Sequence, residues 1–119
     1  MKEETKQWLR KSEEDLKTAR YNFDGSKLDT AAFFCQQAAE KALKAFQIEK
    51  LNRFDKIHDL VKLARSIKAN AKIIKMAEEL NPHYIATRYP IAEVYDKEDV
   101  KTYIKLAEEI IKWAVKKIG

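Results

Sequence analysis

Arg88 stands among three tyrosines, Tyr84, Tyr89 and Tyr95, in one short stretch of the sequence. A guanidinium group binds phosphate through charge-assisted hydrogen bonds, and an aromatic ring can stack on a nucleobase. This grouping predicts a nucleotide-binding site. The same residues also fit a structural role, in which the tyrosines pack the segment and Arg88 pairs with a carboxylate such as that of Glu93.

His58 and Asp59 form a second candidate pair, because an imidazole beside a carboxylate can exchange protons. At the start of a helix the same two residues can instead serve as a cap and as an N-terminal charge. The chain has two histidines without metal-ligand spacing, one cysteine (Cys35), and two isolated glycines (Gly25 and Gly119) that form no phosphate loop. We therefore expect neither a metal nor a cofactor.

Apolar side chains recur at helical spacing through most of the chain, so these candidates must be positioned by helices. The first amphipathic segment ends near Gly25, and the others are predicted over about 28–50, 58–67, 71–80 and 97–118. Between them, residues 81–90 contain both prolines and form the least regular stretch, which is the expected functional loop.

The segment over 28–50 carries two different rows of side chains. One row is made of small residues, which lets another helix approach closely. A separate row, Phe33, Gln37, Glu40 and Lys44, predicts a second interface and hence a dimer. Lys41 lies beside it, so these polar residues could instead line a phosphate-binding groove, or simply be solvated.

The composition fits one helical domain over residues 1–119, with 36% charged and 45% hydrophobic residues and two glycines and two prolines. We predict an all-α fold, an up-and-down antiparallel bundle of four to five helices. The net charge of +5 suits a nucleotide or RNA partner, or only solubility, and the lysine-rich balance is thermophile-like. No signal peptide or membrane span is recognisable, so a cytoplasmic protein is expected.

Several motifs in this order resemble the HEPN family: Trp8 with Asp15 and Leu16, the run from Gln36 to Ala45, His58-Asp59-Leu60, and Tyr84 with Arg88-Tyr89-Pro90. The resemblance spans nearly the whole chain. It implies a helical bundle that pairs as a homodimer, and a partner that is a minimal nucleotidyltransferase in a toxin-antitoxin-like pair.

Other branches of the family are metal-independent ribonucleases whose motif is an arginine and a histidine with four to six residues between them. Arg53 and His58 match this spacing formally, but Phe54 stands where a polar residue is usual. Arg88 is better placed, yet Tyr95 stands where the histidine is needed. The resemblance therefore implies a nucleotide- or RNA-associated binding or regulatory module, with a dimeric ribonuclease or a ligand-free helical oligomerisation domain as alternatives.

Overall fold

The computed structural model describes residues 1–88 and 95–119, and this part of the chain is helical without strands. In chain order the helices are α1 (Glu3–Asp24), α2 (Leu28–Leu51), α3 (Leu60–Ser66), α4 (Ala71–Leu80), the 3₁₀ helix η1 (Asn81–Ile85) and α5 (Lys97–Ile118). The helices expected over 28–50, 71–80 and 97–118 are confirmed to within one residue. None of the described helices combines the length and the apolarity that a membrane span requires.

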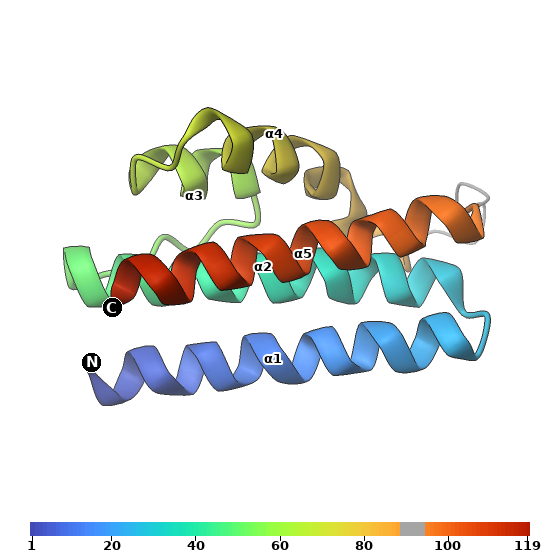
Figure 1. Cartoon of the computed structure of the whole chain (residues 1–119), viewed down its shortest axis with the longest axis horizontal. Helices are drawn as coiled ribbons and strands as arrows, with labels where there is room; N and C mark the ends of the chain where they lie inside the picture. Colours follow the sequence, from blue (N-terminus) through green and yellow to red (C-terminus); the bar gives the residue numbers. More distant parts are fainter. Residues whose placement is uncertain (89–94) are drawn as a thin grey trace.

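The helices form an up-and-down bundle, as predicted (Figure 1). α1 and α2 are antiparallel neighbours. α4 runs back toward the end of the bundle where α2 begins, and α5 then runs in the same direction as α2. The short helices α3 and α4 lie on the side of α2 and α5 that faces away from α1. This arrangement places the segment between α2 and α3 next to η1.

Local side-chain caps set where the short helices begin. The Asp59 carboxylate accepts hydrogen bonds from the backbone N–H groups of Val61 and Lys62, at 3.0 and 3.1 Å. Asn70 caps α4 in the same way, through a 3.0 Å bond from the N–H of Ile73. These caps satisfy backbone donors that a helix start leaves unpaired. Asp59 is thus confirmed as a cap, whereas His58 does not act as one.

Residues 81–85 begin the predicted loop with a helical turn, so the expectation of irregular structure is wrong there. Pro82 sits in the first turn, where its missing N–H leaves no hydrogen bond unmade. The remainder of that segment, 89–94, including Tyr89 and Glu93, lies outside the described residues.

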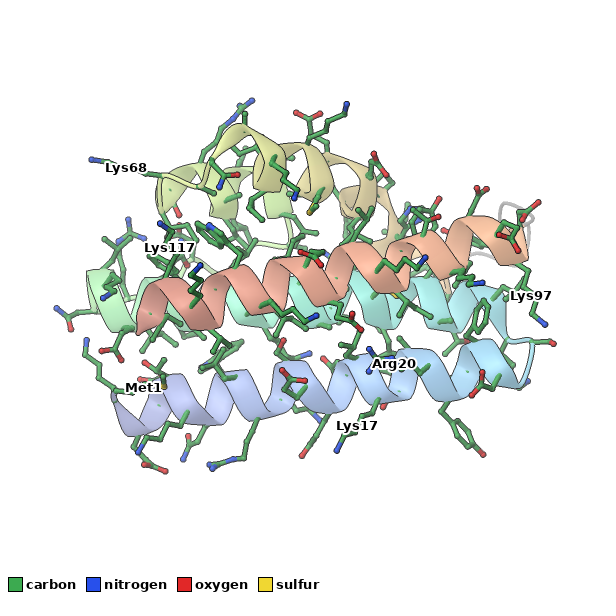
Figure 2. The ribbon with its side chains drawn as sticks, viewed as in Figure 1. Met1, Lys17, Arg20, Lys68, Lys97 and Lys117 are labelled. Atoms are coloured by element: carbon green, nitrogen blue, oxygen red, sulfur yellow. The ribbon has the colours of Figure 1, made fainter. Side chains whose placement is uncertain are left out.

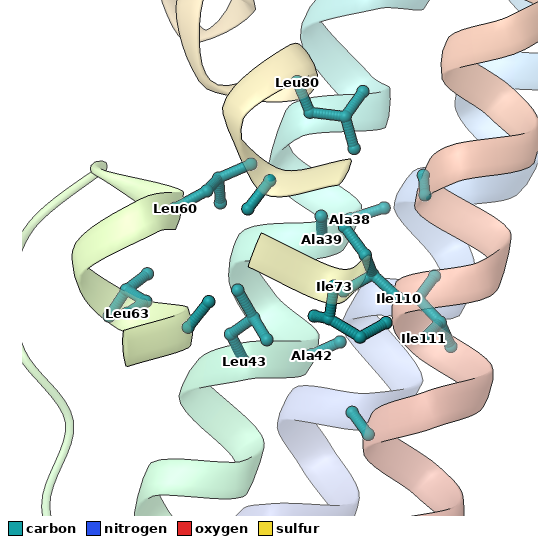
Figure 3. Packing of buried hydrophobic residues seen from close by; sticks show 14 of the residues in the cluster. Ala38, Ala39, Ala42, Leu43, Leu60, Leu63, Ile73, Leu80, Ile110 and Ile111 are labelled. Atoms are coloured by element: carbon teal, nitrogen blue, oxygen red, sulfur yellow. The ribbon is translucent and has the colours of Figure 1, made fainter. Parts of the chain in front are cut away.

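The two parts of the core differ in the size of their side chains. Between α1 and α2 it is made of small side chains, and the Ser12 hydroxyl donates a 2.6 Å hydrogen bond to the backbone carbonyl of Ala38. Between α2, α3, α4 and α5 it is made of large aliphatic side chains, among them Leu43, Leu60 and Ile110 (Figure 3). The small row therefore accommodates α1, and the larger residues hold the short helices against the long ones.

Candidate functional site

Glu40 is a buried carboxylate at the centre of a charged network on α2. Its side chain is 5% exposed and accepts hydrogen bonds from Lys44 Nζ at 3.0 Å and from Gln36 Nε2 at 3.4 Å. The third partner is His58, whose Nδ1 lies 2.9 Å from Glu40 Oε1. A carboxylate removed from water needs such partners, because burying an unpaired charge is costly.

Two aromatic rings cover the Lys44 end of this network. Trp8 of α1 and Phe54 of the α2–α3 connection have ring centroids 4.9 Å apart. The Lys44 ammonium lies 5.9 and 5.7 Å from the two centroids, within cation–π range. The rings close off the buried ion pair from solvent and leave His58 as the part of the network that reaches the surface.

His58 joins the network to η1. Its ring stacks on that of Tyr84, with centroids 5.5 Å apart and planes inclined by 18°. Arg88 Cζ lies 5.8 Å from the centroid of the same tyrosine. The structure therefore brings two of the predicted site residues, His58 and Arg88, to one tyrosine ring.

A hollow of about 370 Å³ opens at this point, lined by Ile57, His58, Asp59, Lys62, Asn81 and Tyr84. Two of these residues already form hydrogen bonds within the protein. Asn81 Oδ1 accepts a 2.8 Å bond from the backbone N–H of Leu60 at the start of α3, and Asn81 Nδ2 donates a 3.3 Å bond to Asp59 Oδ1. No protein partner for His58 Nε2 is present in residues 1–88 and 95–119. With Nδ1 held by Glu40, this nitrogen and the Lys62 ammonium can meet a ligand, together with the Tyr84 hydroxyl and the second carboxylate oxygen of Asp59.

The formal ribonuclease spacing does not correspond to a shared site. Arg53 Nη1 pairs with Asp55 Oδ1 at 2.8 Å and lines a different hollow, beside Lys2 and Asn52. His58 lines the hollow with Tyr84. Arg53 and His58, five positions apart in the sequence, thus line separate hollows, because the chain leaves α2 and turns between them.

Two predicted ligand-binding residues have partners inside the fold. Lys41 pairs with the buried carboxylate of Asp15, joining α2 to α1. The Tyr95 hydroxyl lies 2.8 Å from His83 Nδ1, and its ring packs beside Val100. Of the five predicted residues, Tyr84 lines the hollow and Arg88 lies against the Tyr84 ring, while Tyr89 lies in the undescribed segment.

The row predicted as a dimer interface is divided by the fold. Glu40 and Lys44 are covered by the chain's own residues. Phe33 is half-buried against Phe34, with the rings edge to face at 5.2 Å, and Gln37 is half-buried and donates a 2.8 Å hydrogen bond to Gln36. A dimer contact on this row stays a prediction that rests on Phe33 and Gln37.

Burial removes Cys35 from the chemically active groups. Loss of hydration raises the pKa of this thiol to about 12, against a smaller opposing effect of Arg20. A thiol that stays protonated is a poor nucleophile and a poor metal ligand. No group of three or more histidine, cysteine, aspartate or glutamate side chains that could hold a metal ion occurs in the described part of the chain.

Sequence reasoning missed Lys62, Asn81 and the contact between Glu40 and His58. The polar pair before α3 could have drawn attention to Lys62, which lies four residues after His58. No sequence signal joins Glu40 to His58, since they are 18 residues apart and meet only through folding.

Comparison with known proteins agrees with this architecture. The family model of the HEPN domain matches residues 5–118. The chain belongs to the HEPN family. The structure is similar to that of ST0689, an archaeal HEPN homologue, with 28% identity, a TM-score of 0.83 and full coverage of both chains. It also shares its fold with TT1696 from Thermus thermophilus, at 24% identity and a TM-score of 0.88 over 98% of this HEPN chain and 99% of the other. Among curated proteins, none matches significantly.

Proposed function

We propose that this HEPN protein binds nucleotides through their phosphate groups at the hollow beside His58. The observation that carries the proposal is the convergence of His58, Lys62, Tyr84 and Arg88 from three segments of the chain. The hollow's volume of about 370 Å³ lies within the range of small-molecule sites. Imidazolium, ammonium and guanidinium groups each donate charge-assisted hydrogen bonds to phosphate oxygens.

The contacts of Tyr84 favour phosphate recognition over reading of the base. His58 already stacks on this ring, and Arg88 lies against it. A nucleobase would have to displace one of them before it could stack there. We therefore expect AMP, GMP and CMP to bind with affinities within a few-fold of one another.

Calorimetry with AMP and with adenosine tests this proposal. AMP should bind and adenosine should not, and Arg88→Ala and Lys62→Ala should each weaken AMP binding roughly tenfold, the effect of one charged hydrogen bond. Lys11→Ala is the matched control, because Lys11 is an exposed lysine on α1. Adenosine binding as tightly as AMP, or no heat from either at millimolar concentration, would contradict the proposal and favour a ligand-free oligomerisation domain.

A metal-independent ribonuclease is the second candidate, and the contact between Glu40 and His58 favours it. A buried carboxylate that fixes Nδ1 leaves Nε2 free to exchange the proton of an attacking 2'-hydroxyl, and Arg88 can stabilise charge on the phosphate. Purified protein is incubated with single-stranded RNA and a chelator. Cleavage that His58→Ala abolishes supports this candidate, and intact RNA excludes it.

The regulatory role rests on the resemblance to HEPN proteins that accompany a minimal nucleotidyltransferase. We infer a homodimer that contacts such an enzyme. Co-purification with the protein encoded beside this chain tests the partner, and absence of a complex at micromolar concentration counts against it. Sedimentation of Phe33→Glu beside wild type tests the dimer, since a charge at this half-buried ring should dissociate it.

A further inference from the structure

Four buried polar side chains follow one face of α2. Successive members are three or four residues apart, which places them in a row along the helix. Each is at most 5% exposed, and we call the row the polar seam: Gln36, Glu40, Lys44 and Gln47. Buried polar groups are costly unless they are hydrogen-bonded, so the partners of these side chains show what the row holds in place.

The polar seam holds the connection between α2 and α3. Within the described residues, positions 53–58 of this connection form no backbone-to-backbone hydrogen bond, so side chains must set its path. Gln47 forms two bonds of 3.0 Å with Asp55, since its Oε1 accepts from the backbone N–H and its Nε2 donates to the carboxylate. The Lys44 ammonium lies 5.7 Å from the centroid of the Phe54 ring. The middle of the connection is therefore fixed to the second half of α2.

Gln36 fixes the end of the connection, where it reaches α3. Its Nε2 donates a 3.0 Å hydrogen bond to the backbone carbonyl of His58 and lies 3.4 Å from Glu40 Oε1. The same carboxylate oxygen lies 2.9 Å from His58 Nδ1. One amide thus holds both the main chain of His58 and the carboxylate that meets its ring.

The surroundings of the Gln36 amide fix its direction. Its Oε1 accepts a 2.8 Å hydrogen bond from Gln37 Nε2. A flipped amide would place this oxygen against two others, the His58 carbonyl oxygen and Glu40 Oε1, which need a donor. Because Gln36 is fully buried, losing that donor would cost the desolvation of these groups.

These contacts determine which nitrogen of His58 faces a ligand. An exposed imidazole on an irregular segment ordinarily rotates about two side-chain bonds, and its neutral form carries the proton on either nitrogen. The His58 ring is 54% exposed, yet it stacks on Tyr84 and meets Glu40 through Nδ1. A carboxylate that accepts from Nδ1–H keeps the proton there, which leaves Nε2 as the nitrogen that gains or loses one.

We propose that Gln36 is a positioning residue, which keeps the His58 proton on Nδ1 and directs Nε2 toward the phosphate in the hollow. This inference rests on the proposed function of the hollow and adds a residue that is absent from its lining. Gln36 therefore acts only through His58 and Glu40. Holding one side chain in place before the ligand binds improves affinity by roughly fivefold.

The matched pair Gln36→Met and Gln47→Met tests this inference. Both glutamines are fully buried on α2 and bond the same connection, and of the two Gln36 contacts His58. Imidazole ¹⁵N chemical shifts report which ring nitrogen carries the proton, and His58→Ala distinguishes its signals from those of His83. Gln36→Met should give His58 a mixture of both tautomers and weaken AMP binding about fivefold, whereas Gln47→Met should keep the wild-type tautomer and bind AMP within about twofold of wild type.

Two further variants complete the series. Gln36→Asn keeps an amide in the core but is one methylene shorter, so it should lose the bond to the His58 carbonyl and resemble Gln36→Met. Lys17→Met is the surface control, because Lys17 is exposed on α1, on the side of the bundle away from α3 (Figure 2). It should match wild type in both measurements.

Several results would overturn the inference: a wild-type His58 proton on Nε2, equal changes in Gln36→Met and Gln47→Met, or a changed tautomer without loss of AMP affinity. Unfolding of both Gln36 variants while Gln47→Met stays folded would also overturn it, since Gln36 would then serve the fold rather than the ring. Failure of the wild type to bind AMP refutes the proposed function of the hollow instead, because the imidazole signals are recorded without ligand.

Discussion

Removal of Glu40 should destabilise the protein strongly, because it leaves a charge buried. The Lys44 side chain is 6% exposed, and its ammonium has Glu40 Oε2 at 3.0 Å as its charged partner. In Glu40→Met the ammonium stays under Trp8 and Phe54 without that carboxylate. Breaking one side of a buried pair costs about 3–5 kcal/mol, so we expect a loss of this size in the free energy of unfolding.

The double variant Glu40→Met/Lys44→Met separates the charge effect from the packing effect. Replacing both members by apolar side chains of similar volume should cost far less than Glu40→Met alone, since no charge is stranded. His58→Ala should cost under about 1 kcal/mol, because its side chain is 54% exposed. Urea denaturation followed by circular dichroism gives the free energy of unfolding of the wild type and of each variant.

The result that refutes this reasoning is additivity. If Glu40→Met and Lys44→Met each cost under about 1 kcal/mol, or if the double variant costs their sum, the pair is not coupled and its burial is not the source of the effect. The same variants bear on function, since without Glu40 the His58 ring loses the partner that fixes Nδ1. Glu40→Met should therefore weaken AMP binding about as much as His58→Ala does.

Other contacts lead to three further predictions. Cys35 should not react with a thiol reagent in the native protein at pH 8 and should react on denaturation, because burial raises its pKa to about 12; rapid native labelling would contradict this burial. The pKa of Glu49 is lowered, first because its carboxylate accepts a hydrogen bond from the Lys2 backbone N–H. The stabilisation that this carboxylate provides is therefore present above the unfolded pKa of 4.5 and is lost as pH falls through the pKa of the folded state. Glu49→Gln should thus flatten the fall in stability below about pH 5 in urea titrations, and an unchanged profile would exclude the contact. Ala38→Leu should cost about 1–3 kcal/mol or more by overpacking the α1–α2 contact, whereas Leu at exposed Ala71 should change the melting temperature little.

Local signals were sufficient to locate most helices. The apolar period and the break after residue 50 predict the helix ends, because periodicity acts over a few residues. The turn at 81–85 was missed because proline is unfavourable within a helix but favourable in its first turn, and the sequence does not say which applies.

The candidate site was predicted only in part. Tyr84 lines the hollow and Arg88, close to it in sequence, lies against its ring, so a local grouping was enough to select them. Lys41 was selected for its charge, but Asp15 on another helix neutralises it. A pattern identifies a charged side chain, whereas its partner depends on which helix faces it.

The sequence by itself determined the all-α architecture and the HEPN family, because these depend on composition, spacing and order along the chain. The tertiary structure alone decided that His58 bonds Glu40 rather than capping α3, and that Arg53 and His58 line different hollows. The physical reason is that a side chain's chemistry depends on its neighbours in space, and the turn from α2 to α3 selects those neighbours.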